Sequence, residues 1–213
     1  MKLMIDRTAL LRTLSHAQSV VERRNTIPIL NNVKLDVADG RLSVAATDME
    51  IGLAETTAAD PMSEPGAATA PAHTLHDIVR KLPEGAQVEI SVDPDSERMI
   101  VRAGRSTFQL AVLPTEDFPS LADGEMPIGF SMSARDLRTL IDRTRFAIST
   151  EETRYYLNGI YLHAADHDGV QVLRAVATDG HRLARAEAPL PDGAEGMPGV
   201  IVPRKAVGEL RKL

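Results

Sequence analysis

The tetrapeptide Leu-Arg-Thr-Leu occupies residues 11–14 and returns at residues 137–140, an offset of 126 residues. Three further matches follow in the same order: 30–33 with 157–160 at an offset of 127, 46–48 with 177–179 at 131, and 80–82 with 211–213 at 131. A single tetrapeptide match arises easily by chance, but four in one order with nearly constant offsets indicate an internal duplication. The fold is therefore expected to contain two similar units.

The first copy divides into two halves with one common pattern. Its first half predicts a strand over 2–5, a helix over 7–21 and strands over 33–37, 42–46 and 51–53, the first two of them joined by an Asp39-Gly40 turn. Its second half follows a linker at 60–66 and predicts a strand ending at Pro71, a helix over 73–82 and strands over 88–92, 99–103 and 108–112. Each half is thus a strand, a helix and three strands, which makes the fold α+β with antiparallel sheets.

The second copy begins near Phe130, after a loop at 114–129. The same patterns predict a strand, a helix over 134–148, strands over 158–163, 170–175 and 182–188, then a strand over 199–202 and a helix over 203–213. A counterpart of residues 83–119 is missing, which would leave an apolar stripe of Val207, Leu210 and Leu213 uncovered. We therefore expect an N-terminal piece of a longer protein.

The charge is distributed unevenly along the chain. Lys and Arg number 24 against 30 Asp and Glu, and a net charge of −6 does not suggest a nucleic-acid-binding protein. The four expected helices nevertheless sum to +8, which leaves −14 for the remainder. One amphipathic helix with a charged face is ordinary, but repeated basic helices in an acidic chain favour a surface for a phosphate backbone, bound without base specificity.

Composition excludes several classes of protein. The chain has no cysteine, so disulfides, thiol catalysis and thiolate metal sites are excluded. No uncharged stretch reaches the roughly 18–20 apolar residues of a membrane span, and Asp6 and Arg7 interrupt the N-terminus before any signal-peptide core. We expect a cytoplasmic protein without a membrane partner. Aromatic residues make up only 3% of the chain, which argues against stacking platforms for single-stranded bases.

Motifs for enzymatic chemistry are few. His73 and His76 share a helical face, but no third ligand stands nearby, so neither a metal nor another cofactor is expected. Thr-Asp-Gly-His-Arg at 178–182 looks like a catalytic cluster, yet its counterpart at 47–50 keeps the Thr-Asp and lacks the His. A repeated Thr-Asp favours a structural turn, which leaves the following His and Arg for a role specific to the second copy.

Two other groups of polar and aromatic residues have ordinary explanations. His163 and the pair His167-Asp168 are expected at a hairpin turn, where polar residues are common. Tyr155 and Tyr156 directly follow Arg154, a combination that is typical of an interface anchor but also compatible with a core position.

Eight motifs are spread over the whole chain: RNTIPIL at 24–30, ATD at 46–48, LPEG at 82–85, GRS at 104–106, DFP at 117–119, RYYLNG at 154–159, ATDGHRL at 177–183 and VPRK at 202–205. Together they resemble the bacterial sliding clamp family, the beta subunit of DNA polymerase III, and RYYLNG and ATDGHRL are the most specific of them. The resemblance implies the DNA-clamp fold, a ring of two chains with three domains each, in which helices line the inner face and antiparallel sheets lie outside.

The resemblance also implies an organisation and a function. Residues 1–122 would be the first clamp domain and 128–213 an incomplete second domain, with the third domain absent from this sequence. The family encircles duplex DNA and tethers the replicative polymerase, which confers processivity, while another subunit carries out nucleotidyl transfer. A homodimeric ring and no chemistry of its own are therefore expected.

Two sets of contact residues carry over from the family. The positions that would touch DNA, among which the charge of His73 depends on pH, are Arg24, His73, Thr150, Glu151, Glu152, Thr153, Arg154, Tyr155, Arg204 and Lys205. The family also binds short hydrophobic peptides of the polymerase III core, the clamp loader and repair polymerases. The wall of that pocket would consist of Arg154, Tyr156, Leu157, Thr178, Gly180, His181, Arg182 and Leu183, and its other half would come from residues beyond this sequence.

Two alternatives belong to other classes. A sequence-specific DNA-binding protein would use one short helix near a tight turn, rather than basic residues distributed over repeated helices. An enzyme based on Asp179 and His181 would lose turnover in a His181→Ala variant and keep its protein binding.

Overall fold

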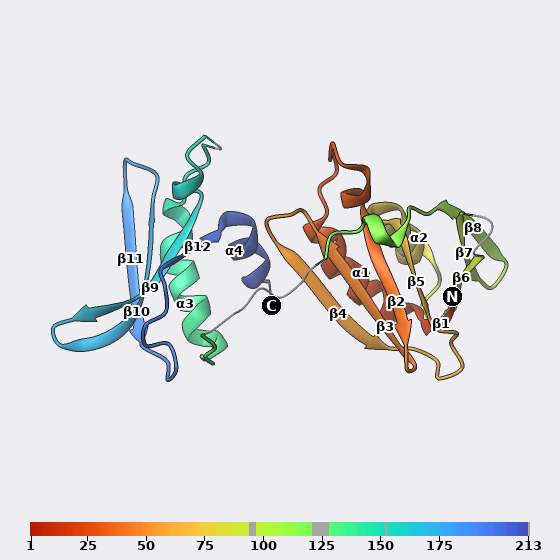
Figure 1. The fold of residues 1–213 in the computed structure, drawn as a ribbon, viewed down its shortest axis with the longest axis horizontal. Coiled ribbons are helices and arrows are strands. Elements are labelled where there is room, and N and C mark those ends of the chain that lie inside the picture. The colour runs from red at the N-terminus through yellow and green to blue at the C-terminus, as the bar shows by residue number, and fades with distance from the viewer. Residues whose placement is uncertain (94–96, 121–127, 152, 213) are drawn as a thin grey trace. The chain divides into compact units, whose positions relative to one another are not determined.

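The computed structural model describes residues 1–93, 97–120, 128–151 and 153–212. The chain forms two compact units, unit 1 over Met1–Ala122 and unit 2 over Asp123–Leu213. Figure 1 shows the helices and strands of both units. The described part of the chain contains no helix that is both long and apolar enough to cross a membrane.

Unit 1 has the predicted order of elements. Its elements are β1 (Lys2–Asp6), α1 (Arg7–Val20), the 3₁₀ turn η1 (Pro28–Asn31), β2 (Asn32–Ala38), β3 (Arg41–Thr47), β4 (Gly52–Ala58), β5 (Gly66–Pro71), α2 (Ala72–Lys81), β6 (Gln87–Asp93), β7 (Arg98–Ala103), β8 (Ser106–Ala111) and η2 (Thr115–Asp117). The Asp39-Gly40 turn has positive φ at both residues, 50° and 67°, as a tight hairpin between right-twisted strands requires. Asp6 caps α1, because its carboxylate accepts hydrogen bonds from the backbone N–H groups of Thr8 and Ala9.

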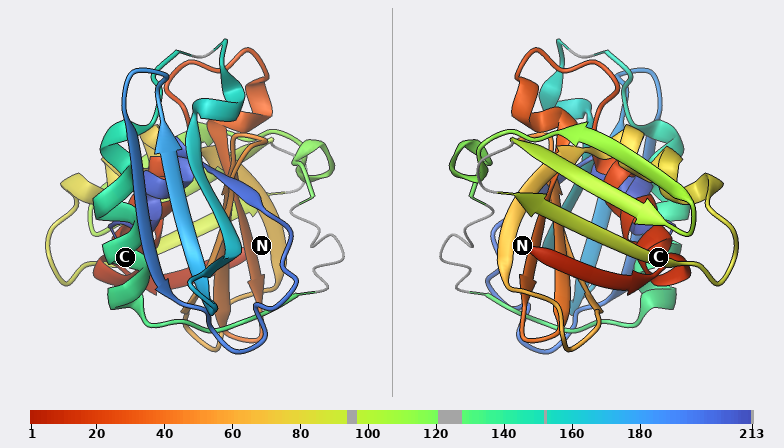
Figure 2. Two further views of the ribbon diagram at one scale, coloured as in Figure 1. Left: turned by 90° about the vertical axis from the view of Figure 1, so that its left-hand side faces the viewer. Right: turned by 90° about the vertical axis from the view of Figure 1, so that its right-hand side faces the viewer.

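The strands of unit 1 pair across its two halves. Unit 1 contains two antiparallel sheets with the orders β4-β3-β2-β5 and β1-β6-β7-β8. β1 therefore pairs with β6 of the second half, and β5 pairs with β2 of the first half. Figure 2 shows β1, in red, beside the yellow-green β6. The two halves thus exchange their first strands, a pairing that the predicted order of elements does not specify.

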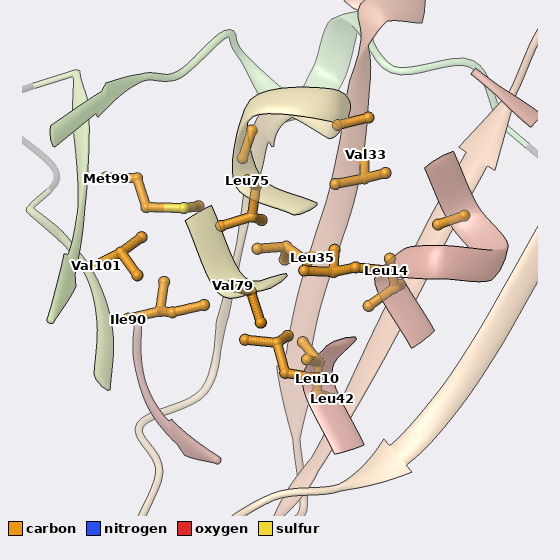
Figure 3. Close-up of a cluster of buried hydrophobic side chains, with 14 of the residues drawn as sticks. Leu10, Leu14, Val33, Leu35, Leu42, Leu75, Val79, Ile90, Met99 and Val101 are labelled. Carbon is orange, nitrogen blue, oxygen red and sulfur yellow. The ribbon is translucent and has the colours of Figure 1, made fainter. Parts of the chain in front are cut away.

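The core of unit 1 joins both sheets through the two helices. Leu10 and Leu14 of α1 and Leu75 of α2 are fully buried, and they meet Leu35 of β2 and Met99 of β7 (Figure 3). The apolar residues lie at helical spacing on the helices and at alternate positions on the strands, so the helices and strands each turn one face toward this core.

Unit 2 repeats the part of unit 1 that runs from α1 to α2. Its elements are α3 (Ala134–Thr144), η3 (Arg145–Ala147), η4 (Tyr155–Leu157), β9 (Gly159–His167), β10 (Val170–Thr178), β11 (Leu183–Pro189), β12 (Val200–Pro203) and α4 (Arg204–Leu210). The sheet order β11-β10-β9-β12 matches β4-β3-β2-β5. Leu140 of α3 and Val207 of α4 pack on the same side of this sheet, against Leu173 of β10.

Four expectations about unit 2 need correction. Residues 128–133 form no strand before α3. The corresponding strand of unit 1, β1, pairs with a strand that follows α2, and no strand follows α4 among the residues that the structure describes. Val207 is only 3% exposed and thus covered, whereas Leu210 is exposed and Leu213 lies outside the described residues. His163 lies inside β9 rather than at the turn, which His167 and Asp168 do flank. Finally, α4 ends at Leu210, before the predicted limit.

Candidate functional site

The segment between β10 and β11 is a turn that several internal hydrogen bonds hold in place. The Thr178 hydroxyl donates to the carbonyl of Arg182 at 2.7 Å and accepts from the N–H of Gly180 at 3.1 Å. Oδ1 of Asp179 accepts from the backbone N–H groups of both His181 and Arg182 at 3.0 Å. These backbone hydrogen bonds, aided by the Arg182 guanidinium, lower the pKa of Asp179 to about 2. Its carboxylate is thus committed to the turn and unsuited to accept a proton near neutral pH.

Unit 1 contains the same turn in the same place. The Thr47 hydroxyl donates to the carbonyl of Ile51 at 2.9 Å and accepts from the N–H of Met49 at 3.0 Å. Oδ1 of Asp48 accepts from the N–H groups of Glu50 and Ile51. The prediction that the repeated Thr-Asp pair makes a structural turn is therefore confirmed.

The two turns differ in the three residues that follow the Thr-Asp pair. Gly180, His181 and Arg182 of unit 2 stand where unit 1 has Met49, Glu50 and Ile51. Gly180 has a φ of 89° and Met49 a φ of 77°, so unit 1 holds a methionine in a conformation that favours glycine. The residues at these three positions are thus specific to each copy: all three are exposed in unit 2, whereas Ile51 of unit 1 is partly buried against the core.

The RYYLNG segment forms a second rigid element of unit 2. Tyr155–Leu157 make the 3₁₀ turn η4, and the carbonyl of Leu157 accepts from the N–H of Ser149 at 3.0 Å, which closes the preceding loop. The carbonyl of Asn158 accepts from the N–H of Arg204 at 2.8 Å and ties the segment to the start of α4. Gly159 is required here, since a Cβ would stand 2.3 Å from the carbonyl oxygen of Val202.

The structure brings these two elements together. Nη1 of Arg154 lies 3.4 Å from the position that a Cβ on Gly180 would take. Tyr156 and Leu183 are 56% and 65% exposed, which is unusual for large apolar side chains, while Leu157 and Thr178 are half-buried. His181 and Arg182 are exposed on the same turn as Gly180. The predicted peptide wall therefore comprises two adjacent, well-bonded elements with exposed apolar and cationic side chains.

The predicted DNA-contacting residues of unit 1 occupy two positions. Arg24 is exposed in the segment after α1. His73, on the first turn of α2, is half-buried, and its ring nitrogens lie 3.0 Å from Oε1 of Gln18 and from the carbonyl of Val21. His73 thus links α2 to α1, and its ring has less freedom to reach a ligand than Arg24 has.

The other predicted DNA-contacting residues belong to unit 2. Thr150, Glu151, Thr153, Arg154 and Tyr155 are exposed in the loop before and at the start of η4, and Glu152 lies outside the described residues. Arg154 pairs with Glu151 at 3.0 Å, and the Tyr155 and Tyr156 rings meet edge to face at 5.5 Å. Arg204 is exposed and Lys205 half-buried on the first turn of α4.

Acidic side chains partly neutralise the basic helical faces. Asp142 of α3 lies within ion-pair distance of Arg138, Arg145 and Arg211, and its pKa is lowered, chiefly by the hydrogen bond from Arg211. His16 of α1 pairs with Glu55 of β4 at 2.7 Å. Arg12, Arg135 and Arg143 remain exposed. Among the described residues, no three potential ligands of the His, Asp and Glu type are grouped closely enough to hold a metal ion.

One neighbour of this surface was not identified from the sequence. The guanidinium carbon of Arg182 lies 5.5 Å from the centre of the Phe146 ring, within cation–π distance. Phe146, one of four phenylalanines in the chain, is 55% exposed, which is unusual for a large aromatic side chain. In the sequence, the only signal for this position is an aromatic residue close to the arginines of α3. Its place beside Arg182 is not evident before the chain is folded.

Comparisons with known proteins cover the whole chain. Residues 1–122 match the family model of the DNA polymerase III beta subunit, N-terminal domain, and residues 131–213 that of its central domain. The chain is 55% identical over 213 residues to the beta sliding clamp of Caulobacter vibrioides, covering all of this chain and 57% of the relative. It is 42% identical over 215 residues to the beta sliding clamp of Escherichia coli K12, covering 100% of this chain and 56% of that protein.

Solved structures agree with these relatives. A beta sliding clamp from Caulobacter crescentus has a TM-score of 0.94 at 55% identity, and a sliding clamp from Pseudomonas aeruginosa, solved bound to griselimycin, has a TM-score of 0.89 at 42% identity. Both alignments cover 100% of this chain and 56% of the neighbour's, so the chain spans just over half the length of its relatives. The predicted resemblance and the α+β clamp fold are confirmed: the chain belongs to the DNA polymerase III beta subunit family, the beta sliding clamps.

Proposed function

We propose that the full-length protein is a sliding clamp that encircles duplex DNA as a homodimeric ring and tethers the replicative polymerase, without chemistry of its own. The observation that carries the proposal is the agreement over the whole chain with beta sliding clamps, at 55% identity and a TM-score of 0.94. Residues 1–122 form clamp domain 1 in this proposal and 128–213 belong to clamp domain 2, with a third domain outside this sequence.

The charges of the helices support binding to a phosphate backbone. Exposed arginines lie on α1 and on α3, which hold equivalent places in the two units, for example Arg12 and Arg138. A sequence-specific binder would concentrate its contacts on one helix in the major groove. Basic residues on repeated helices instead suit contacts with phosphates, whose spacing does not depend on sequence.

A topological test separates a ring from an ordinary DNA-binding protein. The full-length protein is loaded on nicked circular DNA and isolated by gel filtration, and half of the sample is then linearised with a restriction enzyme at constant salt. A clamp slides off the free ends, so protein is expected in the DNA fraction only for the uncut circle. Equal retention on both DNAs, with release only by added salt, would contradict the ring and indicate electrostatic binding.

The same proposal includes a docking surface for short hydrophobic peptides of the polymerase III core, the clamp loader and repair polymerases. The exposed side chains of Tyr156 and Leu183, next to the cations of Arg154 and Arg182, support this role, because apolar anchors with an arginine beside them are typical of binding hot spots.

Variants of the full-length protein test the docking surface. Leu183→Ala is expected to weaken binding of a fluorescent leucine-rich peptide about tenfold, since an exposed apolar anchor is lost, and His181→Ala is expected to weaken it as well. Glu50→Ala is the matched control, because Glu50 holds the position of His181 in the turn of unit 1. Unchanged affinity in both unit 2 variants would contradict the assignment, and loss of a catalytic turnover in His181→Ala would favour the enzyme alternative.

A further inference from the structure

Arg182 is held from two sides. Its Nε donates to Oδ2 of Asp179 at 2.9 Å, and its guanidinium carbon lies 5.5 Å from the centre of the Phe146 ring. An aromatic ring within about 6 Å attracts a cation through the negative charge density of its face. The guanidinium is therefore held by the carboxylate at its Nε and by the face of the Phe146 ring.

The two holding groups come from rigid parts of unit 2. Phe146 belongs to η3, directly after α3, where the buried Thr144 hydroxyl donates to the carbonyl of Leu140 and secures the last helical turn. Asp179 is fixed by the two backbone hydrogen bonds of its own turn. The position of the Arg182 side chain is therefore set by elements that are ordered independently of it.

The outer end of Arg182 remains available. In the part of the chain that the structure describes, no hydrogen bond or ion pair engages its two terminal nitrogens, and the side chain is 59% exposed. A guanidinium that uses only its Nε in holding contacts presents two parallel donors, a geometry that suits a carboxylate or a pair of carbonyl oxygens.

Unit 1 lacks this arrangement at the equivalent positions. Arg182 corresponds to Ile51, and Phe146, at the offset of 126 residues that relates α1 to α3, corresponds to Val20, which is only 1% exposed. The turn that both units share thus forms without either partner. The pair of Phe146 and Arg182 is not needed for this turn, and it occurs only in the copy that carries the docking surface.

We propose that Phe146 is a positioning residue of the docking surface, which holds Arg182 so that its terminal N–H groups face an acidic side chain of the bound peptide. This inference rests on the proposed peptide docking. A guanidinium that is already in place binds an oxygen pair at a lower entropic cost than one that must be ordered on binding. Phe146 thereby adds a preference for peptides with an acidic residue beside their apolar anchor.

The affinity test uses the full-length protein and two fluorescent peptides, one of leucines with a single aspartate and one with asparagine in its place. Phe146→Leu keeps the apolar volume but removes the ring, so about two- to fivefold weaker binding of the aspartate peptide is expected. The asparagine peptide should bind with little change. Phe146→Tyr keeps the ring and should restore the wild-type affinity.

A double-mutant cycle tests whether the effect of Phe146→Leu on peptide binding depends on Arg182. In an Arg182→Gln background, Phe146→Leu is expected to have no further effect on the aspartate peptide, because the group that it positions is gone. Equal losses in both backgrounds, or a loss that Phe146→Tyr does not restore, would overturn the inference and leave Phe146 with a structural role only.

A measurement without peptide keeps the inference separate from the proposed docking. The side-chain NMR signals of Arg182 should show an upfield ring-current shift that is lost in Phe146→Leu and kept in Phe146→Tyr. If the wild-type protein bound neither peptide, the proposed docking would fail, and the inferred preference for acidic peptides would fail with it. If peptides bound but the Arg182 signals were the same in all three proteins, the positioning role alone would be refuted.

Discussion

Arg154 and Gly180 lie close together in unit 2: a Cβ added to Gly180 would stand 3.4 Å from Nη1 of Arg154. This is ordinary van der Waals distance, so the contact itself leaves room for an alanine. The backbone does not, because Gly180 has a φ of 89°. The need for glycine at position 180 thus comes mainly from its backbone conformation and only to a lesser degree from the nearby Arg154 side chain.

Gly180→Ala is therefore expected to lower the free energy of unfolding of unit 2 by about 1 kcal/mol, the usual cost of a left-handed residue with a Cβ. Met49→Gly is the matched variant, since Met49 holds the same place in unit 1 with a φ of 77°, and it should not destabilise unit 1. Urea unfolding of the two variants checks both statements. An unaffected Gly180→Ala would show that the turn relaxes to another conformation.

The Asp179→Asn variant should change how stability depends on pH. The pKa of Asp179 is lowered from 3.8 to about 2, mainly by hydrogen bonds from the backbone of Arg182 and His181. Since the charged form is favoured in the folded state, its contribution is fully present above about pH 4 and is lost as the pH falls toward 2. The melting temperatures of wild type and variant should thus differ at pH 7 and converge between pH 4 and 2. A constant difference would contradict this.

His76 should also make stability depend on pH, here through a group that gains a positive charge when it is protonated. His76 is only 9% exposed, and its Nε2 lies 3.3 Å from the Ser15 hydroxyl. Burial lowers its pKa below 6.5, although the neighbouring Asp77 acts to raise it. Below about pH 6.5 the unfolded chain binds more protons than the folded one, so stability should fall as the pH drops. His76→Gln, which keeps a polar group near Ser15, should lose less stability than wild type between pH 7.5 and 5.5 in urea unfolding. Equal losses would place the effect elsewhere.

Arg211 is expected to hold α4 in place. Its Nε donates to Oδ1 of Asp142 at 2.7 Å and so links α4 to α3. In Arg211→Gln, amide hydrogen exchange in α4 should become faster while exchange in β10 stays unchanged, as measured by mass spectrometry. Lys212→Gln serves as the control, because Lys212 pairs with Glu209 in its own segment. Faster exchange in both variants would point to a general effect of charge.

The sequence was sufficient for the elements that local patterns determine. The spacing of Leu10, Leu14 and Ala17 placed α1 within one residue of its observed end, and the Asp39-Gly40 turn placed the hairpin of β2 and β3. Strand partners were harder, because alternation shows which face of a strand is buried but not which strand lies beside it. The exchange of β1 and β5 between sheets was missed for this reason.

The candidate site shows the same limit. The repeated Thr-Asp pair revealed the turn, because an Asx turn depends on residues two or three positions apart. The contact of Arg154 with Gly180 and that of Phe146 with Arg182 join segments about 26 and 36 residues apart. Only the folding of η3, η4 and the turn onto one edge of unit 2 brings these side chains together, and no local pattern records that.

The exchange of first strands has a consequence for how the protein is made. β1 pairs Lys2 with Ser91 and Asp6 with Gln87, so the first strand to leave the ribosome must wait for some eighty further residues before its partner is synthesised. Contacts of such large sequence separation slow folding, because a long loop must close first. Until then the backbone N–H and C=O groups of β1 that later pair with β6, and the apolar face of β1, remain available to chaperones. Unit 1 should accordingly become resistant to protease on the ribosome only after β6 has emerged, in one step rather than half by half.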